Sequence, residues 1–214
     1  MGMATPRSDT PFEALTPDRR RAMTRQHLLE AAAIVFARHG FHGATLDEVS
    51  ATAGFTKGAV YSNFKNKDDL FLALLEDRTD RQLAVVSDVL AAGGHAAAEQ
   101  FPLVSQLFRG ELFWDDDFAT LYLEFVLYAR RHPDAQTKLA ESARRTRAMV
   151  QELIDAEYTA LGTAPKYAPA DIAAMSLALF GGFGLDRLVD PLAVSSDLLD
   201  TTLTFLFEAL VDAP

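Results

Sequence analysis

The segment TLDEVSATAGFTKGAVYSNFKNK, residues 45–67, constrains the fold of this chain more than any other stretch. Thr45 and Glu48 have the spacing of a capping box, in which each side chain satisfies a backbone N–H of the other residue at the start of a helix. Leu46 and Val49 follow at helical spacing and give that helix an apolar face. The segment therefore predicts a short amphipathic helix that begins at Thr45.

A turn and a second helix follow in the same segment. Gly54 stands where a helix commonly ends in a left-handed residue, and Thr56 is a suitable N-cap for the next helix. That helix, residues 57–64, is expected to bury Val60 and Phe64. Two helices joined by a glycine-containing turn make a helix-turn-helix unit, whose second helix enters the major groove of DNA.

A longer pattern of residues runs from about Arg19 to Leu75. Its members are Arg25, Leu28, Leu29, Ala31, Ala32, Phe36, Gly40, Phe41, Ala44, Thr45, Val49, Ala53, Gly54, Thr56, Lys57, Gly58, Val60, Tyr61, Phe64, Lys65, Asn66 and Lys67. In order and spacing this pattern resembles the N-terminal signature of TetR-type transcriptional regulators (the TetR/AcrR family). The remaining two-thirds of the chain has no comparably sharp motif.

The second helix offers a set of polar and small residues suited to DNA. The DNA-binding candidates are Thr45, Thr56, Lys57, Gly58, Tyr61, Ser62, Asn63 and Lys67. Lysine can donate to guanine, asparagine can pair with adenine, and serine or tyrosine commonly holds a phosphate. The resemblance implies phosphate contacts for Thr45 and Lys67. The alternative is a solvated helix face, with Thr45 a simple cap and Lys67 a surface charge.

The charge of the chain is divided unevenly along its length. The net charge of −10 is unusual for a DNA-binding protein. However, residues 1–67 hold nine Lys or Arg against six Asp or Glu, whereas the remaining residues hold eleven against twenty-four. A mildly basic head on an acidic body is therefore expected. Only charges that face the DNA contribute fully to binding, so we expect affinity that falls steeply with salt.

The rest of the sequence has helical periodicity, with glycine and proline between the segments. We expect an all-α protein of about nine helices. The expected divisions are a flexible arm at 1–16, a helix-turn-helix DNA-binding domain at 17–66 and a ligand-binding and dimerisation domain at 67–214. The helices expected after the DNA-binding domain span about 67–90, 96–112, 121–131, 134–161, 169–189 and 195–211.

The last two expected helices each have a broad apolar face. The resemblance implies that they pair with their copies in a second subunit to form a four-helix bundle. The candidates for this interface are Met175, Leu179, Phe183, Leu199, Leu203, Leu206 and Leu210. Ordinary core packing within one chain explains the same pattern. A dimer would carry two recognition helices to a palindromic site.

The central part of the chain is rich in aromatic residues, which suggests a pocket for a small, largely apolar effector. The candidates to line it are Trp114, Phe118, Tyr122, Phe125 and Met149. Aromatic core packing is the alternative. The function implied is a DNA-binding regulator, by default a repressor, that leaves its operator when the effector binds. An activator would carry the same motifs, and a regulator could respond to a partner protein instead.

The sequence gives no positive case for an enzyme, a metal site or a cofactor. There are no cysteines, and the five histidines lack metal-ligand spacing. No uninterrupted apolar run reaches the length of about 18 residues that suggests a membrane span, so we expect a cytoplasmic protein with no membrane partner. The remaining alternative is a helical small-molecule-binding or catalytic protein in which the helix-turn-helix is only scaffold.

Overall fold

The computed structural model describes residues 16–92, 115–162 and 164–195, together with 197–199, 201, 202 and 205. Every regular element in these ranges is a helix, which confirms the expected all-α class. The arm predicted for 1–16, except Thr16, lies outside the described residues. The helix predicted for 96–112 and most of the last predicted helix also lie outside them.

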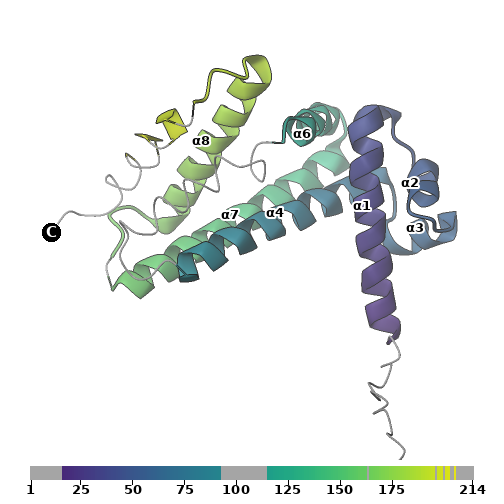
Figure 1. Cartoon of the computed structure of the whole chain (residues 1–214), viewed down its shortest axis with the longest axis horizontal. Coiled ribbons are helices and arrows are strands. Elements are labelled where there is room, and N and C mark those ends of the chain that lie inside the picture. Colours follow the sequence, from purple (N-terminus) through teal and green to yellow (C-terminus); the bar gives the residue numbers. More distant parts are fainter. Residues whose placement is uncertain are drawn as a thin grey trace, which may run out of the picture.

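Three helices form the head of the molecule. These are α1 (Pro17–Gly43), α2 (Leu46–Thr52) and α3 (Lys57–Asn63). Helix α1 begins as a proline-initiated helix should: the hydroxyl oxygen of Thr16 accepts a hydrogen bond from Arg19 N at 3.3 Å. Helices α2 and α3 lie on the side of α1 that faces away from the long helices of the body (Figure 1).

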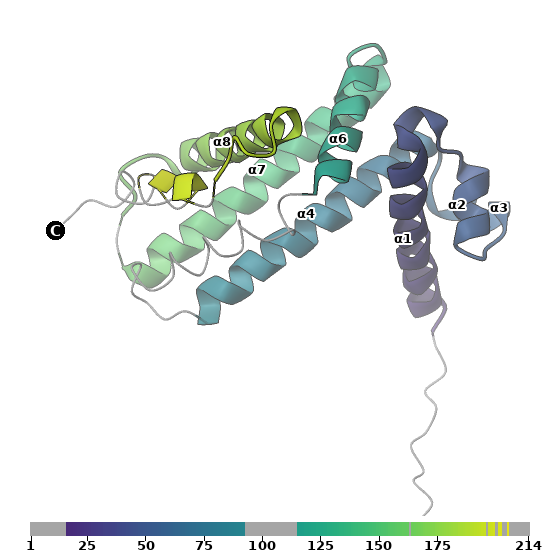
Figure 2. The same ribbon diagram turned by 45° about the horizontal axis from the view of Figure 1, so that its top comes forward.

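Four described helices follow: α4 (Lys67–Ala92), α6 (Asp116–Ala129), α7 (Pro133–Leu161) and α8 (Pro169–Val189). Helices α4 and α7 run side by side, and α1 crosses near their ends (Figures 1 and 2). Helix α6 packs against both α1 and α7, and α8 returns along α7. The bounds of α7 and α8 follow the sequence signals, because each starts at a proline and α7 ends before the left-handed Gly162.

Helix α1 does not end at Gly40, where the sequence predicts its last residue. Gly40 has φ 66° and ψ 176°, which breaks the helix, but the chain then makes one more helical turn to Gly43. Ala44 N closes that turn by donating to Gly40 O at 3.2 Å. The prediction was right about a break at this glycine and wrong about the end of the element, because the turn after it is held by contacts that are distant in sequence.

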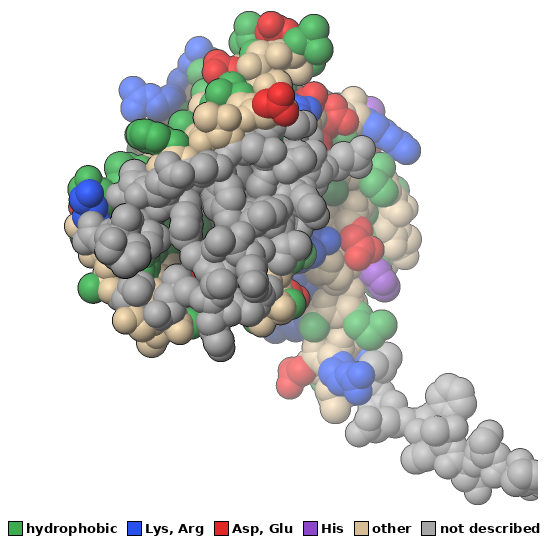
Figure 3. Space-filling view, turned by 60° about the vertical axis from the view of Figure 1, so that its left-hand side comes forward, with side chains coloured by type: hydrophobic (Ala, Val, Ile, Leu, Met, Phe, Trp, Pro, Cys, Tyr) green, Lys and Arg blue, Asp and Glu red, His purple; other side chains and the backbone are tan. Residues whose placement is uncertain are grey.

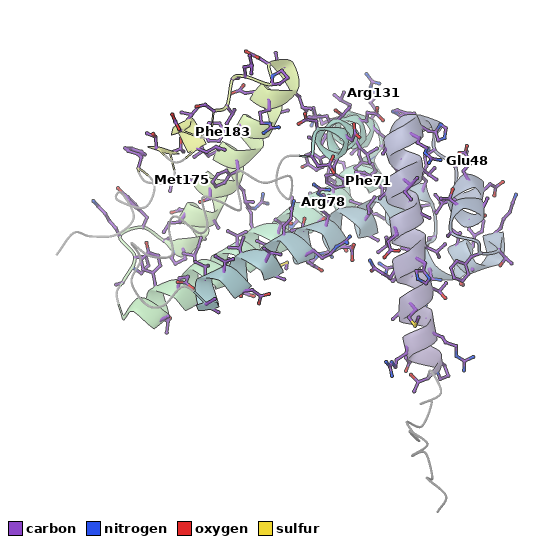
Figure 4. The ribbon with its side chains drawn as sticks, in the orientation of Figure 1. Glu48, Phe71, Arg78, Arg131, Met175 and Phe183 are labelled. Carbon is purple, nitrogen blue, oxygen red and sulfur yellow. The ribbon has the colours of Figure 1, made fainter. Side chains whose placement is uncertain are left out.

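The main core lies where the head meets the body. Phe36, Phe41, Phe71 and Phe125 are almost completely buried, and the ring of Phe125 lies 4.4 Å from that of Phe71 and 4.9 Å from that of Phe41, centroid to centroid. Figure 4 places Phe71 at the crossing of α1, α4 and α6. The head and the body therefore share one continuous core, which runs across the predicted domain boundary at residues 66 and 67.

Helix α8 is apolar but largely uncovered. Its most apolar window has a mean hydropathy of 1.5, and 11% of that window is buried. By length and composition alone α8 is apolar enough to cross a membrane, although it contains no uninterrupted apolar run of about 18 residues. One such helix is weak evidence, because a helix that a second subunit covers meets the same description.

Candidate nucleic-acid interface

The start of α2 carries the predicted capping box. Glu48 N donates to the hydroxyl oxygen of Thr45 at 3.2 Å, and Thr45 N donates to Oε2 of Glu48 at 3.2 Å. The Thr45 hydroxyl also donates to the same carboxylate oxygen at 2.9 Å. A phosphate contact by the Thr45 side chain would therefore compete with bonds that already stabilise the helix start.

The turn between α2 and α3 depends on one glycine. Gly54 has φ 70°, a left-handed conformation that costs a residue with a Cβ about 1–2 kcal/mol. Its N–H donates to Ala51 O at 3.2 Å, and Phe55 N donates to Ser50 O at 2.9 Å. Thr56 then caps α3, since its hydroxyl oxygen accepts from Ala59 N at 3.3 Å. The turn and both caps agree with the sequence prediction.

Helix α3 separates a buried face from an exposed polar one. Val60 and Phe64 are buried as predicted. The exposed residues are Lys57, Gly58, Tyr61 and Ser62, and Asn63 is half-buried. The structure thus places five of the eight DNA-binding candidates on one short helix.

Two of these side chains are already oriented along the helix. The Ser62 hydroxyl donates to Ala59 O at 2.9 Å, and Nδ2 of Asn63 donates to the same oxygen at 2.8 Å. Tyr61 is 57% exposed, so its ring projects from the helix surface. An exposed aromatic side chain between polar residues suits a contact with a sugar or phosphate.

Lys57 has an acidic partner that the sequence analysis missed. Its ammonium donates to a carboxylate oxygen of Asp47 on α2, and this hydrogen bond raises the pKa of Lys57 above that of an ordinary lysine. The two residues are ten positions apart and belong to different helices, so no local spacing signals the pair. The charge of Lys57 is therefore partly compensated while the DNA is absent.

Lys67 contacts the end of α1. Its ammonium donates to the carbonyl oxygens of His42 and Ala44, both at 3.1 Å, and lies 4.8 Å from the centroid of the Phe41 ring. Burial lowers the pKa of Lys67. An ammonium has three donors. Lys67 therefore holds the end of α1 first, and one donor is left for a phosphate.

The basic residues at the start of α1 flank this interface. Arg19, Arg20 and Arg21 are exposed, whereas the guanidinium of Arg25 lies 4.6 Å from the centroid of the Phe64 ring. Figure 3 views the molecule from the α8 side, opposite the head, and the described acidic and basic side chains there are scattered around its rim.

The candidates for an effector pocket do not share one described cavity. Phe118 lines a cavity of about 160 Å³ between α1, α4 and α6, and the guanidinium of Arg78 lies 4.4 Å from its ring centroid. Met149 lines a cavity of about 480 Å³ whose other walls, from α4 and α7, are mainly polar. Phe125 is packed into the core between head and body, and Tyr122 is half-buried. Trp114 lies outside the described residues.

The candidates for the dimer interface also lie in different environments. Met175 is 47% exposed on α8, and Leu179 is half-buried. Phe183 is half-buried and packs with Phe180 against a small cluster that includes the buried Leu199. Figure 4 shows Met175 and Phe183 along the same helix. The remaining three candidates, Leu203, Leu206 and Leu210, lie outside the described residues.

A helix-turn-helix head on a helical body defines a class of DNA-binding regulators, and family comparison agrees. Residues 28–74 match the model of bacterial regulatory proteins of the tetR family, and residues 103–212 match that of the BetI-type transcriptional repressor C-terminal domain. The chain belongs to the TetR family of transcription regulators. Members of this family bind operator DNA and small-molecule effectors and are not enzymes.

Curated relatives match this chain over about a third of its length or less. The transcriptional repressor AcnR of Corynebacterium diphtheriae is 40% identical over 67 residues, which are 31% of this chain and 35% of that protein. The transcriptional activator FasR of Mycolicibacterium smegmatis is 38% identical over 66 residues, 31% of this chain and 30% of that protein. The chain thus matches about a third of the length of each of these relatives. One of them is a repressor and the other is an activator.

Solved structures share the whole fold. A TetR-family regulator from Mesorhizobium loti has a TM-score of 0.67 at 18% identity and covers 89% of this chain and 98% of its own. FadR of Bacillus subtilis, in complex with stearoyl-CoA, has a TM-score of 0.64 at 16% identity with coverage of 86% and 98%. A regulator from Saccharomonospora viridis in complex with choline has a TM-score of 0.62 at 18% identity with coverage of 90% and 100%. At these identities the likeness concerns the fold.

Proposed function

We propose that this chain is a homodimeric repressor that reads a palindromic operator through α3 and leaves it when a small effector binds the body. The observation that carries the proposal is the exposed polar face of α3, presented by a capped and fully formed helix-turn-helix. Of the predicted DNA-binding residues, Lys57, Gly58, Tyr61, Ser62 and Asn63 belong to α3, with Lys57 and Tyr61 as the principal contacts. Thr45, Thr56 and Lys67 lie at the starts of α2, α3 and α4 and are proposed as phosphate contacts beside it. The site of action is the cytoplasm, where the operator lies.

The uncovered face of α8 supports a dimer. Met175, Leu185 and Val189 are 47%, 48% and 88% exposed. Burial of an apolar side chain of this size contributes about 1.5–3 kcal/mol when it is complete. A second copy of α8 and the segment after it would supply the cover. Two subunits joined in this way place two α3 helices on successive major grooves of the DNA.

The effector is assigned to the body, near the side chains of α6. Two proteins of the same fold have structures in complex with small molecules, stearoyl-CoA in one and choline in the other, which supports a small-molecule effector. Half-buried Phe118 and Tyr122 offer apolar surface on α6, and the Tyr122 hydroxyl can donate a hydrogen bond. A small, largely apolar molecule with one polar group suits these two side chains.

Effector and DNA are coupled through the long helix α4, which begins in the head and ends in the body. The effector changes operator affinity only to the extent that it binds the two positions of the head unequally. If an effector binds tightly and operator affinity stays the same, this part of the proposal fails.

The proposal is tested by selecting bound sequences from a random duplex library at two salt concentrations. Enrichment of a palindrome that weakens at the higher salt supports a dimeric, sequence-specific regulator. Absence of any enriched sequence at the lower salt contradicts it. Transcription in vitro from a promoter that carries the selected site then decides the direction of control, with reduced transcript expected.

A further inference from the structure

Residues 41–44, the helical turn between the break at Gly40 and the start of α2, are held at their N-terminal end by a residue of the body. Because Gly40 breaks α1, the N–H of Phe41 lacks the acceptor that a continuous helix would provide. It donates instead to Oε2 of Glu124 on α6, at 2.6 Å. A carboxylate at the start of a helical turn forms a charge-assisted hydrogen bond and is favoured by the peptide dipoles.

The glycine at the break is favoured by its φ angle and leaves room for this contact. A Cβ on Gly40 would lie 2.7 Å from Oε2 and 2.9 Å from Oε1 of Glu124, so the carboxylate would have to move away. Any other residue there would also adopt a strained left-handed φ. The backbone of α1 and the side chain of α6 therefore fit each other at this point.

The other end of the same turn is held by a second helix of the body. Lys67, the first residue of α4, donates to the carbonyl oxygens of His42 and Ala44. Between the two ends, the ring of Phe41 packs 4.9 Å from that of Tyr128 on α6, centroid to centroid. The turn thus lies between an anion from α6 and a cation from α4.

The turn leads directly into the DNA-reading unit. Ala44 is its last residue and is buried, and Thr45 caps α2. No flexible linker separates the turn from α2. A displacement of α6 relative to α4 would therefore rotate the turn and carry α2 and α3 with it.

We propose that Glu124 is a positioning residue that sets the angle of the head on the body and thereby the spacing of the two α3 helices in the dimer. This inference rests on the proposed function, because it concerns the geometry of palindrome binding. Glu124 does not touch DNA. It acts through the Phe41 N–H, and without it the head keeps its fold but takes a wider range of angles.

The first test is a series of palindromes whose half-sites are separated by different numbers of base pairs, with a single half-site as reference. The wild type is expected to prefer one spacing. Glu124→Ala is expected to lose about tenfold in affinity for that spacing, the loss of one charged hydrogen bond, while half-site affinity stays within about twofold. Glu124→Gln keeps an acceptor for Phe41 N and is expected to recover part of the preference.

Glu152→Ala, which removes an exposed carboxylate of α7, is the matched control and is expected to behave as the wild type. If Glu124 only stabilised the fold, Glu124→Ala would lower the folded fraction and would weaken binding to every palindrome and to the half-site equally. An unchanged spacing preference in Glu124→Ala overturns the proposal.

A second measurement needs no DNA. The chain has no cysteine, so spin labels can be placed at Ala51→Cys on α2 and Ala148→Cys on α7, both exposed positions. With labelled protein diluted in unlabelled protein, the distance distribution between the labels is expected to be narrow in the wild type and broader with Glu124→Ala. If the wild type shows no spacing preference, the proposal of palindrome binding fails. The role of Glu124 is tested separately, because an equally narrow distribution of label distances in both proteins would overturn it.

Discussion

At the residue scale, two lysines that the sequence assigns to DNA differ in what surrounds them. Lys57 is exposed and pairs only with Asp47 across the surface of the head. Lys67 is half-buried and donates to two backbone carbonyls. The first lysine is therefore free to exchange a carboxylate for DNA, whereas the second is part of the framework that supports α2.

This difference predicts opposite effects of two substitutions. Lys57→Ala should weaken operator binding and lower the slope of log affinity against log salt by about 1, with the thermal midpoint unchanged. Lys67→Met should lower the stability by about 1 kcal/mol, or the midpoint by about 2–4 °C, because two carbonyls lose their donor. Binding titrations at several salt concentrations and thermal melts measure both. Equal melting losses for the two variants would contradict the assignment.

Three tyrosines of the body predict an alkaline limit to stability. Burial raises the pKa of Tyr122, Tyr128 and Tyr158 above the ordinary value of 10.0. A group whose folded pKa is the higher one stabilises the fold below its unfolded pKa, and this contribution is lost as the pH rises through the folded value. Unfolding free energy should therefore decline above pH 10. Tyr122→Phe should reduce that decline. If the unfolding free energy of the wild type and of the variant falls equally with pH, Tyr122 does not contribute to the decline.

Asp47 and Glu124 show which site residues sequence reasoning does not reach. Lys57, Tyr61 and Ser62 can be predicted because the periodicity of the helix places them on its exposed side. The partner of Lys57 lies on another helix, and Glu124 is 83 positions from Phe41. Both contacts depend on packing angles between helices, which a single sequence does not encode locally.

At the element scale, two glycines of the head have different roles. Gly54 has a positive φ and no atom within 4 Å of the position of a Cβ. Gly58 lies inside α3, and a Cβ at this position would lie 3.7 Å from the Thr56 hydroxyl oxygen, an ordinary contact distance. The turn needs a glycine at position 54 because of its positive φ. The backbone of α3 does not need a glycine at position 58.

These roles predict opposite signs of stability change. Gly54→Ala should destabilise by about 1 kcal/mol through backbone strain alone. Gly58→Ala should stabilise α3 by about 0.5–1 kcal/mol, yet weaken DNA binding, because the added methyl separates the helix from the DNA backbone. Chemical denaturation and operator titration measure the two effects. If Gly58→Ala binds as tightly as the wild type, the close approach assigned to α3 is wrong.

The elements of the head follow from short-range signals that the sequence contains. The capping box, the left-handed Gly54 and the Thr56 cap all act over three or four residues, so they were predicted with their correct partners. The cavities were not, because Phe118, Phe125 and Met149 are distributed among three environments by the crossing of α1, α4, α6 and α7. An aromatic-rich sequence is compatible with a pocket and with a packed core alike.

At the scale of the whole molecule, the apolar surface of α8 is the feature that a single chain does not explain. Introducing a charge there should separate the subunits. Met175→Asp is expected to give a monomer in sedimentation and to lose about 10²–10⁴-fold in palindrome affinity, because the second half-site is no longer linked to the first. Leu127→Asp is the matched control, since Leu127 is 63% exposed on α6, outside the proposed interface. A dimer in both variants would place the interface elsewhere.

The most direct test of the central claim is protection of guanine N7 from methylation in the selected palindrome. If two α3 helices enter successive major grooves, the protein should protect two patches whose centres are about 10–10.5 base pairs apart on one face of the duplex. Lys57→Ala together with Tyr61→Ala should abolish both patches without unfolding the protein. A single patch, or protection that survives the double substitution, would contradict a dimer that reads DNA through α3.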